Sequence, residues 1–137
     1  MTASPLATKL KLKANQNAAV VSAPEGYLQE LVPLPEGVHL SDHLNGKYDW
    51  LQVFVKNEVE LTALIPRILA ALQPESLLWL TFPKGSSKVQ TDLTRDKGWD
   101  PVRGAELKWI NLVSVDAVWS TFSLRPYRAG EVHQSSR

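Results

Sequence analysis

Two short segments of this chain constrain its fold more than any others, because each is apolar on both faces of the strand that it would form. They are residues 50–55, with the sequence Trp-Leu-Gln-Val-Phe-Val, and residues 77–82, with the sequence Leu-Leu-Trp-Leu-Thr-Phe. Strands that are apolar on both faces are typical of a parallel sheet, in which helices cover both sides. The two segments therefore predict strands inside such a sheet, with 50–55 at its centre.

The segment between these two strands has the pattern of an amphipathic helix. Asn57 and Glu60 match the N-cap and N3 positions of a helix start, and Gln73-Pro74 ends the pattern. Apolar residues recur between them at the spacing of one helix face: Leu61, Leu64, Ile65, Ile68 and Leu72. Pro66 removes a backbone hydrogen bond and is expected to kink the helix near Thr62. Strand, helix and strand then form a right-handed βαβ unit.

The amino-terminal part of the chain predicts a strand-turn-helix unit. Ser4 and Pro5 are typical of an N-cap and the first residue of a short helix. Residues 18–23 are expected to form a small buried strand, which the turn Pro24-Glu25-Gly26 breaks before a helical turn. A minor second strand is expected at residues 38–40.

The carboxyl-terminal part predicts an antiparallel hairpin. Strands at 108–115 and 118–124 are separated only by Asp116-Ala117, and so short a connection forces antiparallel pairing. Before the hairpin, residues 89–97 are weakly helical and residues 99–104 are expected to be an irregular connection. The whole pattern is that of an α/β fold with a mainly parallel sheet.

Length and composition limit the class of protein. A chain of 137 residues fits one core, and we expect a single domain over residues 1–128 with a flexible tail over 129–137. Net charge is +1, which gives no sign of nucleic-acid binding. No apolar stretch approaches the roughly 20 residues that span a bilayer, and residues 1–8 lack the pattern of a secretory signal. Since Cys is also absent, we expect a cytoplasmic protein with no membrane partner.

Short motifs along the chain add a resemblance to this layout. They are Ala23-Pro24-Glu25-Gly26-Tyr27, Leu77-Leu78-Trp79, Pro83-Lys84-Gly85-Ser86-Ser87, Thr91-Asp92-Leu93 and Asp116-Ala117-Val118-Trp119-Ser120. From Pro5 to Pro126 the chain resembles a bacterial family of uncharacterised small proteins with a truncated class I methyltransferase-like fold. The resemblance implies a three-layer, Rossmann-like α/β fold with a mostly parallel sheet that ends in an antiparallel hairpin. It implies no particular activity.

The segment after the first expected strand departs from the methyltransferases that bind S-adenosylmethionine. In those enzymes a glycine-rich turn lets the backbone approach the cofactor. Here residues 20–26 read Val-Val-Ser-Ala-Pro-Glu-Gly, with one glycine and a rigid proline. Close approach is hindered, and we expect no bound cofactor. Asp42, just past the second strand, still matches an acidic residue that holds a ribose, and a solvated loop residue is the alternative reading.

The favoured ligand site follows from the fold, because ligands of open α/β sheets bind beyond the carboxyl ends of the strands. Three loops are expected to meet there: Pro24, Glu25 and Gly26 after the first strand, Lys56 after the central strand, and residues 83–88 after the next. The last loop offers amides, hydroxyls and ammonium groups to a phosphate or carboxylate, from Lys84, Gly85, Ser86, Ser87 and Lys88. A solvated loop has the same composition. Glu25 and Lys56 form either a structural ion pair or part of the pocket.

Other chemistries lack their usual residues. His39, His43 and His133 are the only histidines, and no Cys completes a zinc site with them. No G-x-S-x-G segment follows a strand, so a Ser-His-Asp triad is unsupported. The tryptophans at 50, 79, 109 and 119 are expected to fill the core. We therefore expect neither a metal site nor catalytic residues.

These observations favour a non-catalytic binding or regulatory domain that recognises an anionic small molecule or a protein partner. Two alternatives stay open. The first is an S-adenosylmethionine-dependent methyltransferase with a degenerate cofactor loop, in which Asp42 holds the ribose and residues 83–87 lie near the methyl acceptor. The second is a structural protein that forms a homodimer through the open edge of the hairpin.

Overall fold

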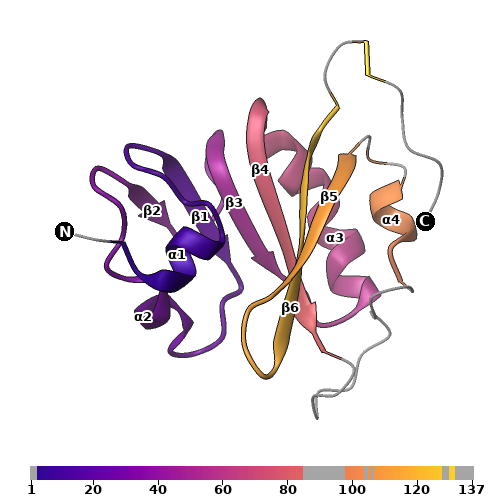
Figure 1. Cartoon of the computed structure of the whole chain (residues 1–137). Coiled ribbons are helices and arrows are strands. Elements are labelled where there is room, and N and C mark those ends of the chain that lie inside the picture. The colour runs from indigo at the N-terminus through magenta and orange to yellow at the C-terminus, as the bar shows by residue number, and fades with distance from the viewer. Residues whose placement is uncertain (1–2, 85–97, 104, 106, 128–129, 132–137) are drawn as a thin grey trace.

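The fold is described from a computed structural model of the chain (Figure 1). The structure describes residues 3–84, 98–103, 105, 107–127 and 130–131. Its elements, in chain order, are α1 (Pro5–Lys9), β1 (Asn17–Val21), α2 (Tyr27–Leu31), β2 (His39–Ser41), β3 (Tyr48–Phe54), α3 (Glu58–Ala71), β4 (Leu72–Pro83), α4 (Asp100–Arg103), β5 (Leu107–Ser114) and β6 (Trp119–Pro126).

Among the described residues, the strands form one six-stranded sheet in the order β2-β1-β3-β4-β6-β5. Strands β1 to β4 pair in parallel, whereas β6 pairs antiparallel with both β4 and β5. The expected parallel βαβ unit, the interior position of β3 and the closing hairpin are confirmed. All four parallel strands end at the same edge of the sheet, which is the lower edge in Figure 1. We call it the carboxyl edge.

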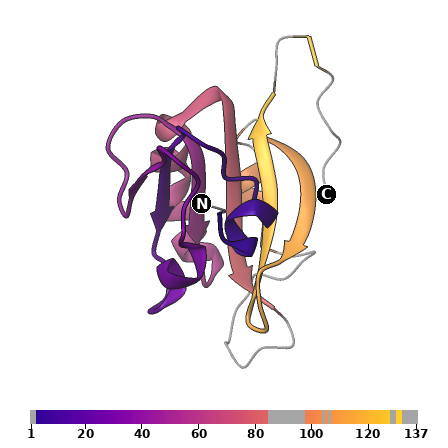
Figure 2. The same ribbon diagram turned by 60° about the vertical axis from the view of Figure 1, so that its left-hand side comes forward.

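Helices cover both faces of the sheet, so the molecule has three layers. Helices α1 and α2 lie on one face, and α3 and α4 lie on the other (Figures 1 and 2). Each face has its own buried cluster of apolar side chains. This confirms the expected three-layer, Rossmann-like α/β class, and it places the start of α3 beside the carboxyl edge.

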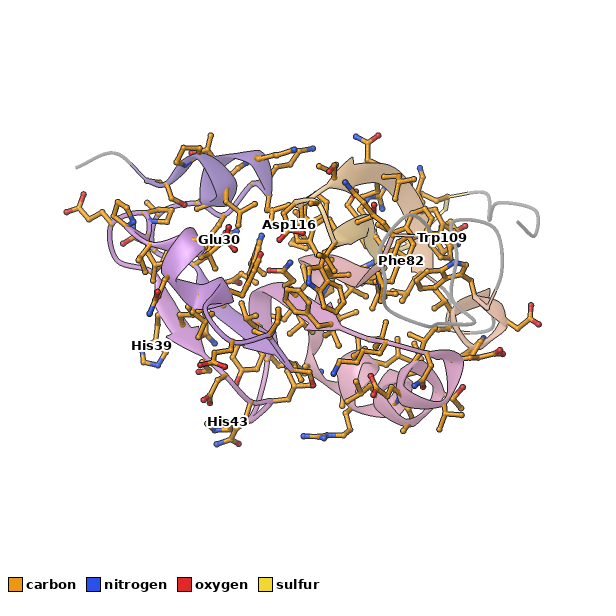
Figure 3. The ribbon with its side chains drawn as sticks, turned by 90° about the horizontal axis from the view of Figure 1, so that it is seen from below. Glu30, His39, His43, Phe82, Trp109 and Asp116 are labelled. Atoms are coloured by element: carbon orange, nitrogen blue, oxygen red, sulfur yellow. The ribbon has the colours of Figure 1, made fainter. Side chains whose placement is uncertain are left out.

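The core beneath α3 and α4 is rich in aromatic rings. Leu61, Ile65 and Ile68 of α3 pack toward the sheet as their spacing predicts. Phe122 of β6 contacts three neighbouring rings, at centroid distances of 5.4 Å to Phe82, 5.2 Å to Trp99 and 4.8 Å to Trp109. Figure 3 shows Phe82 and Trp109 on this side of the molecule. These rings fix the hairpin and α4 to the rest of the domain.

The core beneath α1 is organised around one carbonyl group. Leu10 is the C-cap of α1, where a carbonyl lacks a partner in the helix. The indole Nε1 of Trp50 and that of Trp79 both donate to the Leu10 carbonyl oxygen, each at 2.8 Å. Both tryptophans are fully buried, and Trp109 and Trp119 are more than nine tenths buried. The predicted core role of these four residues is therefore confirmed.

A row of hydrogen-bonded side chains crosses the buried sheet on the α2 side. The Tyr27 hydroxyl donates to Gln52 Oε1 at 2.7 Å, and Gln52 Nε2 donates to Thr81 Oγ1 at 3.0 Å. Thr81 Oγ1 then donates to Thr121 Oγ1 at 2.9 Å. Buried polar groups need partners of this kind, and the row joins α2, β3, β4 and β6 in one register.

Two expectations for chain segments differ from the structure. Residues 99–104 were expected to be irregular but contain α4, which forms because Trp99 and Val102 are buried against the core. Leu72 was expected at the end of the helix but begins β4. The strand starts there because Ser76 Oγ, which donates to the carbonyl of Tyr48, accepts a hydrogen bond from the Gln73 amide.

The remaining expectations concern the chain ends and the connections. The predicted helix at 89–97 lies outside the described residues, as does most of the predicted tail at 129–137. Within that tail, Glu131 binds Arg125 through two hydrogen bonds of 2.7 and 2.8 Å and binds Lys108 at 3.2 Å. In the described part of the chain, no helix is long and apolar enough to cross a membrane.

Candidate functional site

The turn after β1 holds two residues with left-handed backbone. Ser22, directly after the strand, has a φ of 61°, and Gly26, which precedes α2, has a φ of 83°. In cofactor-binding turns, a glycine at this place adopts the same left-handed conformation. The backbone thus keeps the sharp turn, although serine, which adopts it at a cost of about 1–2 kcal/mol, stands at its first position.

The middle of this turn differs more from a cofactor-binding turn. Pro24 has no amide proton to donate, and its carbonyl accepts a hydrogen bond from the Tyr27 amide at 3.1 Å. Glu25 and Gly26 are exposed. A side chain at Gly26 would meet no atom within 4 Å, so glycine is required there by its φ and not by lack of space. The turn therefore cannot offer a ligand an amide at Pro24 or at Tyr27.

The end of β3 is shaped by the start of α3. Asn57 Oδ1 accepts a hydrogen bond from the Glu60 amide at 2.9 Å, as the predicted N-cap requires. Glu60 Oε1 reaches back and accepts from the Lys56 amide at 2.9 Å. This reciprocal capping fixes the Glu60 carboxylate at the carboxyl edge and leaves the Lys56 side chain exposed to solvent.

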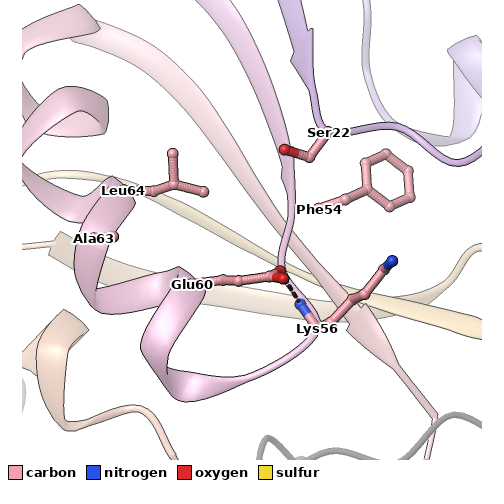
Figure 4. Close-up of a pocket in the computed structure, with 6 residues that line it drawn as sticks. All are labelled: Ser22, Phe54, Lys56, Glu60, Ala63 and Leu64. Atoms are coloured by element: carbon pink, nitrogen blue, oxygen red, sulfur yellow. Dashed lines mark hydrogen bonds between the residues drawn. The ribbon is translucent and has the colours of Figure 1, made fainter.

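A pocket of about 360 Å³ lies between the end of β1, the end of β3 and α3 (Figure 4). It is lined by Ser22, Phe54, Lys56, Glu60, Ala63 and Leu64. The Ser22 hydroxyl points toward Leu64 across it (Figure 4). The ring of Phe54 packs on the opposite face of the sheet against Tyr27 and Trp119, so its main chain borders the pocket. We call this the carboxyl-edge pocket.

Lys84, the first of the ligand residues predicted in the loop at 83–88, lies toward the hairpin. Its Nζ donates to Ser114 Oγ at 2.7 Å, and its amide donates to the Val118 carbonyl at 2.7 Å. The other residues predicted in this loop, 85–88, lie outside the described residues. Asp116 at the hairpin tip accepts hydrogen bonds from the amides of Val118 and Trp119, and Figure 3 shows it on the same side as Glu30 of α2.

Asp42 lies one residue past β2, as the sequence indicates. Its carboxylate is 82% exposed and lies 2.9 Å from His43 Nδ1. The hydrogen bond from His43 lowers the pKa of the Asp42 carboxyl, so this group stays ionised at neutral pH. Neither residue lines the carboxyl-edge pocket. In the described ranges, no three His, Asp or Glu side chains are grouped to hold a metal ion.

The structure brings together only part of the predicted ligand site. Of its described residues, Lys56 lines the carboxyl-edge pocket, whereas Pro24, Glu25, Gly26 and Lys84 do not. The sequence left an ion pair between Glu25 and Lys56 as one of two interpretations, and in the described part of the chain these two residues form no ion pair with each other. The pocket instead adds residues that the sequence did not indicate as ligands: Ser22, Glu60, Ala63 and Leu64.

Replacing Ser22 by glycine tests whether this turn is strained. The Ser22→Gly variant is expected to be as stable as the wild type or up to about 1 kcal/mol more stable, because glycine adopts a positive φ freely. The matched variant Ser41→Gly, in β2, is expected to lose about 0.5–1 kcal/mol, since glycine weakens a regular strand. Chemical denaturation measures both. A Ser22→Gly variant that loses as much stability as Ser41→Gly would show that the turn is unstrained.

Comparisons with known proteins bear on the fold and not on the sequence family. No family model matches the chain, and no curated protein matches it in sequence. Solved structures do match. The mitomycin 7-O-methyltransferase MmcR superposes with a TM-score of 0.64 at 8% identity, covering 82% of this chain and 49% of MmcR. This chain thus spans about half the length of MmcR.

Two shorter structures match along most of their length. A SAM-dependent methyltransferase from Aquifex aeolicus has a TM-score of 0.61 at 10% identity, with 85% of each chain covered. DhpI, solved in complex with SAH, has a TM-score of 0.61 at 9% identity, covering 89% of this chain and 83% of DhpI. These likenesses, together with the strand order and the layers, show that the chain has a methyltransferase-like, Rossmann-like fold.

Proposed function

We propose that the chain binds S-adenosylmethionine in the carboxyl-edge pocket and acts as a methyltransferase with a modified cofactor turn. The observation that carries this proposal is the position of the pocket. It opens beside the left-handed turn at Ser22, at the carboxyl ends of β1 and β3, on a methyltransferase-like sheet. Ligands of open α/β folds bind at this edge.

The groups that line the pocket fit the chemistry of this cofactor. Ala63 and Leu64 offer an apolar surface to the adenine ring, and the Glu60 carboxylate and Ser22 hydroxyl suit ribose hydroxyls or the amino group. The Lys56 ammonium group suits the cofactor's carboxylate. A volume of about 360 Å³ lies within the range of roughly 300–1,000 Å³ that is common for ligand pockets. When bound, the cofactor supplies an activated methyl group.

The same geometry predicts weak binding. Pro24 has no amide proton, and the Ser22 side chain narrows the approach to the turn, so a ligand gains fewer backbone hydrogen bonds than a glycine-rich turn provides. Asp42 lies one residue past β2 and outside the pocket. Its ionised carboxylate therefore contacts a ribose hydroxyl only if the ligand extends beyond the pocket. We therefore expect association that requires high micromolar to millimolar ligand.

Calorimetry with S-adenosylmethionine and with its demethylated product tests the proposal. The Ala63→Arg variant is expected to weaken binding by at least about tenfold, because the arginine fills the pocket and repels the sulfonium charge. Thr62→Arg is the matched control, since it places the same charge on the neighbouring exposed residue of α3, outside the pocket. No heat at millimolar ligand, or equal loss in both variants, would refute binding at this site.

A second candidate is a non-catalytic domain that binds an anionic small molecule or a protein partner at the same edge. The observation that favours it is Pro24, which removes an amide from the place where a cofactor is usually held. A thermal-shift screen separates the two candidates. This candidate predicts that phosphates, nucleotides or acidic metabolites raise the melting temperature, whereas S-adenosylmethionine does not. The increase should be lost in Lys84→Ala and Lys88→Ala. That combination of results would support this candidate and exclude the first.

A further inference from the structure

A second pocket lies at the opposite end of α3. It has a volume of about 260 Å³ and is lined by Leu44, Gly46, Lys47, Arg67, Ala70 and Ala71. Because Gly46 and Lys47 directly precede β3 and α3 runs back along the sheet, this pocket lies at the amino ends of the strands. We call it the amino-edge pocket. On α3 the nearest lining residues of the two pockets are Leu64 and Arg67, which lie about 4.5 Å apart along the helix axis at 1.5 Å per residue.

The pocket exists because one crossover of the fold has no helix. The connection from β1 to β2 contains α2 and that from β3 to β4 contains α3, whereas β2 joins β3 through residues 42–47 alone. β2 and β3 lie on either side of β1 and are parallel to it, an arrangement whose crossover usually includes a helix. Without that helix, the side of α3 that carries Arg67 and Ala70 stays exposed.

Two positive side chains line the pocket, and neither has an acidic partner among the described residues. In the described part of the chain, neither Lys47 nor Arg67 forms an ion pair. Lys47 Nζ makes one long hydrogen bond, of 3.4 Å, to the Leu72 carbonyl, so most of its donor capacity is unused. The nearby Asp49 is already engaged, since its carboxylate accepts from the Asn17 amide at 2.8 Å and from Gln73 Nε2 at 3.4 Å.

The charge of this pair selects the class of ligand. A guanidinium group and an ammonium group together match the two negative charges of a phosphate monoester, with the planar guanidinium able to donate two parallel hydrogen bonds. The carboxyl-terminal end of α3 carries a partial negative charge of about half an elementary charge from the helix dipole, which repels an anion. The two full positive charges of Lys47 and Arg67 exceed it. Leu44, Ala70 and Ala71 can cover a short carbon skeleton. The pocket is smaller than the roughly 300 Å³ that marks the lower end of the range for drug-sized ligands.

We propose that Lys47 and Arg67 form a binding site for a small phosphorylated molecule at the amino-edge pocket. This site is independent of the proposed methyltransferase function, because it lies at the other end of α3 and the described residues that line the two pockets are all different. The chemistry that recognises the ligand is one dianionic phosphate held between the two cations. A short apolar or hydroxylated carbon chain follows it toward Leu44.

Amide NMR spectra of the whole protein, titrated with inorganic phosphate and with glycerol phosphate, test this proposal. Both probes are expected to shift, in a saturable way, the amides of residues 44–47 and 67–71. Glycerol phosphate is expected to bind more tightly, because its carbons contact the apolar lining. Arg67→Met and Lys47→Met should each weaken binding about tenfold, the effect of losing one charge-assisted contact. Arg67→Lys keeps the positive charge but loses the planar guanidinium, so its affinity for phosphate should lie between that of these variants and that of the wild type.

Lys56→Met is the matched control, since it removes one exposed positive charge at the other pocket. It should leave phosphate binding unchanged, and Arg67→Met should leave the calorimetric titration with S-adenosylmethionine unchanged. The remainder of each NMR spectrum reports whether the variant is folded. The proposal would be overturned by shifts that do not saturate, or by equal shifts in sodium chloride at the same ionic strength. It would also be overturned if Arg67→Met and Lys56→Met weakened phosphate binding equally. These outcomes do not depend on whether S-adenosylmethionine binds.

Discussion

Replacing both Trp50 and Trp79 by phenylalanine is expected to cost more stability than the two single replacements added together. Either indole alone still donates to the Leu10 carbonyl, so the lost hydrogen bond should cost each single variant only about 1 kcal/mol of unfolding free energy, beyond the packing lost with the smaller ring. In the double variant the carbonyl is buried with neither indole, which adds a desolvation penalty of about 1–3 kcal/mol. The hydrogen-bond terms alone should therefore reach about 3–5 kcal/mol, and the packing lost from the two buried indoles adds to them.

Chemical denaturation of the wild type, both single variants and the double variant forms a complete double-mutant cycle. A coupling of about 1 kcal/mol or more, with the double variant worse than additive, would support a shared acceptor. An exactly additive cycle would contradict it. Trp119→Phe is a useful control, because the hydrogen bonds to the Leu10 carbonyl among the described residues come from Trp50 and Trp79. Its replacement should show no coupling with Trp79→Phe.

Tyr27→Phe is expected to cost about 1–3 kcal/mol at neutral pH, because it leaves Gln52 Oε1 buried without the donor that now lies 2.7 Å away. Burial raises the pKa of the Tyr27 hydroxyl well above its ordinary value. Thus the folded state holds this proton more tightly than the unfolded state does. The stability that it contributes is fully present below about pH 10, the ordinary tyrosine pKa, and is lost as the pH rises further.

The pH dependence separates this group from the rest of the protein. Above about pH 10 the wild type should lose stability more steeply than Tyr27→Phe, by up to about 1.4 kcal/mol per pH unit. Urea denaturation at neutral pH and at about pH 11 measures the difference. Parallel losses in the two proteins, together with equal stability at neutral pH, would mean that the Tyr27 hydroxyl is not buried in the row of hydrogen bonds.

The central βαβ unit could be predicted from the sequence because its signals are local. Asn57 and Glu60 specify the start of α3, and the apolar runs in β3 and β4 have the composition of strands that are covered on both faces. The hairpin follows in the same way from the short connection at Asp116. The spacing of Leu72 fits the helix, whereas the strand that begins there is held by one hydrogen bond from Ser76 to the carbonyl of Tyr48 in β3, a residue distant in the sequence.

The candidate site was harder to predict, since its residues meet only in the folded sheet. Lys56 was indicated because it follows a buried strand, and Glu60 was recognised as a capping residue but not as a ligand. Serine carries no sequence signal for a positive φ, so the left-handed turn at Ser22 was not predicted. The amino-edge pocket depends on a crossover without a helix. That feature is visible only once β2 and β3 are known to lie on either side of β1.

An NMR titration of the whole protein with S-adenosylhomocysteine shows whether the carboxyl-edge pocket holds an S-adenosyl ligand. If the ligand binds there, we expect little change at residues 44–47 and saturable shifts of the amides at Ser22, Lys56, Glu60, Ala63 and Leu64. Saturable shifts confined to other parts of the molecule, or none at millimolar ligand, would contradict it.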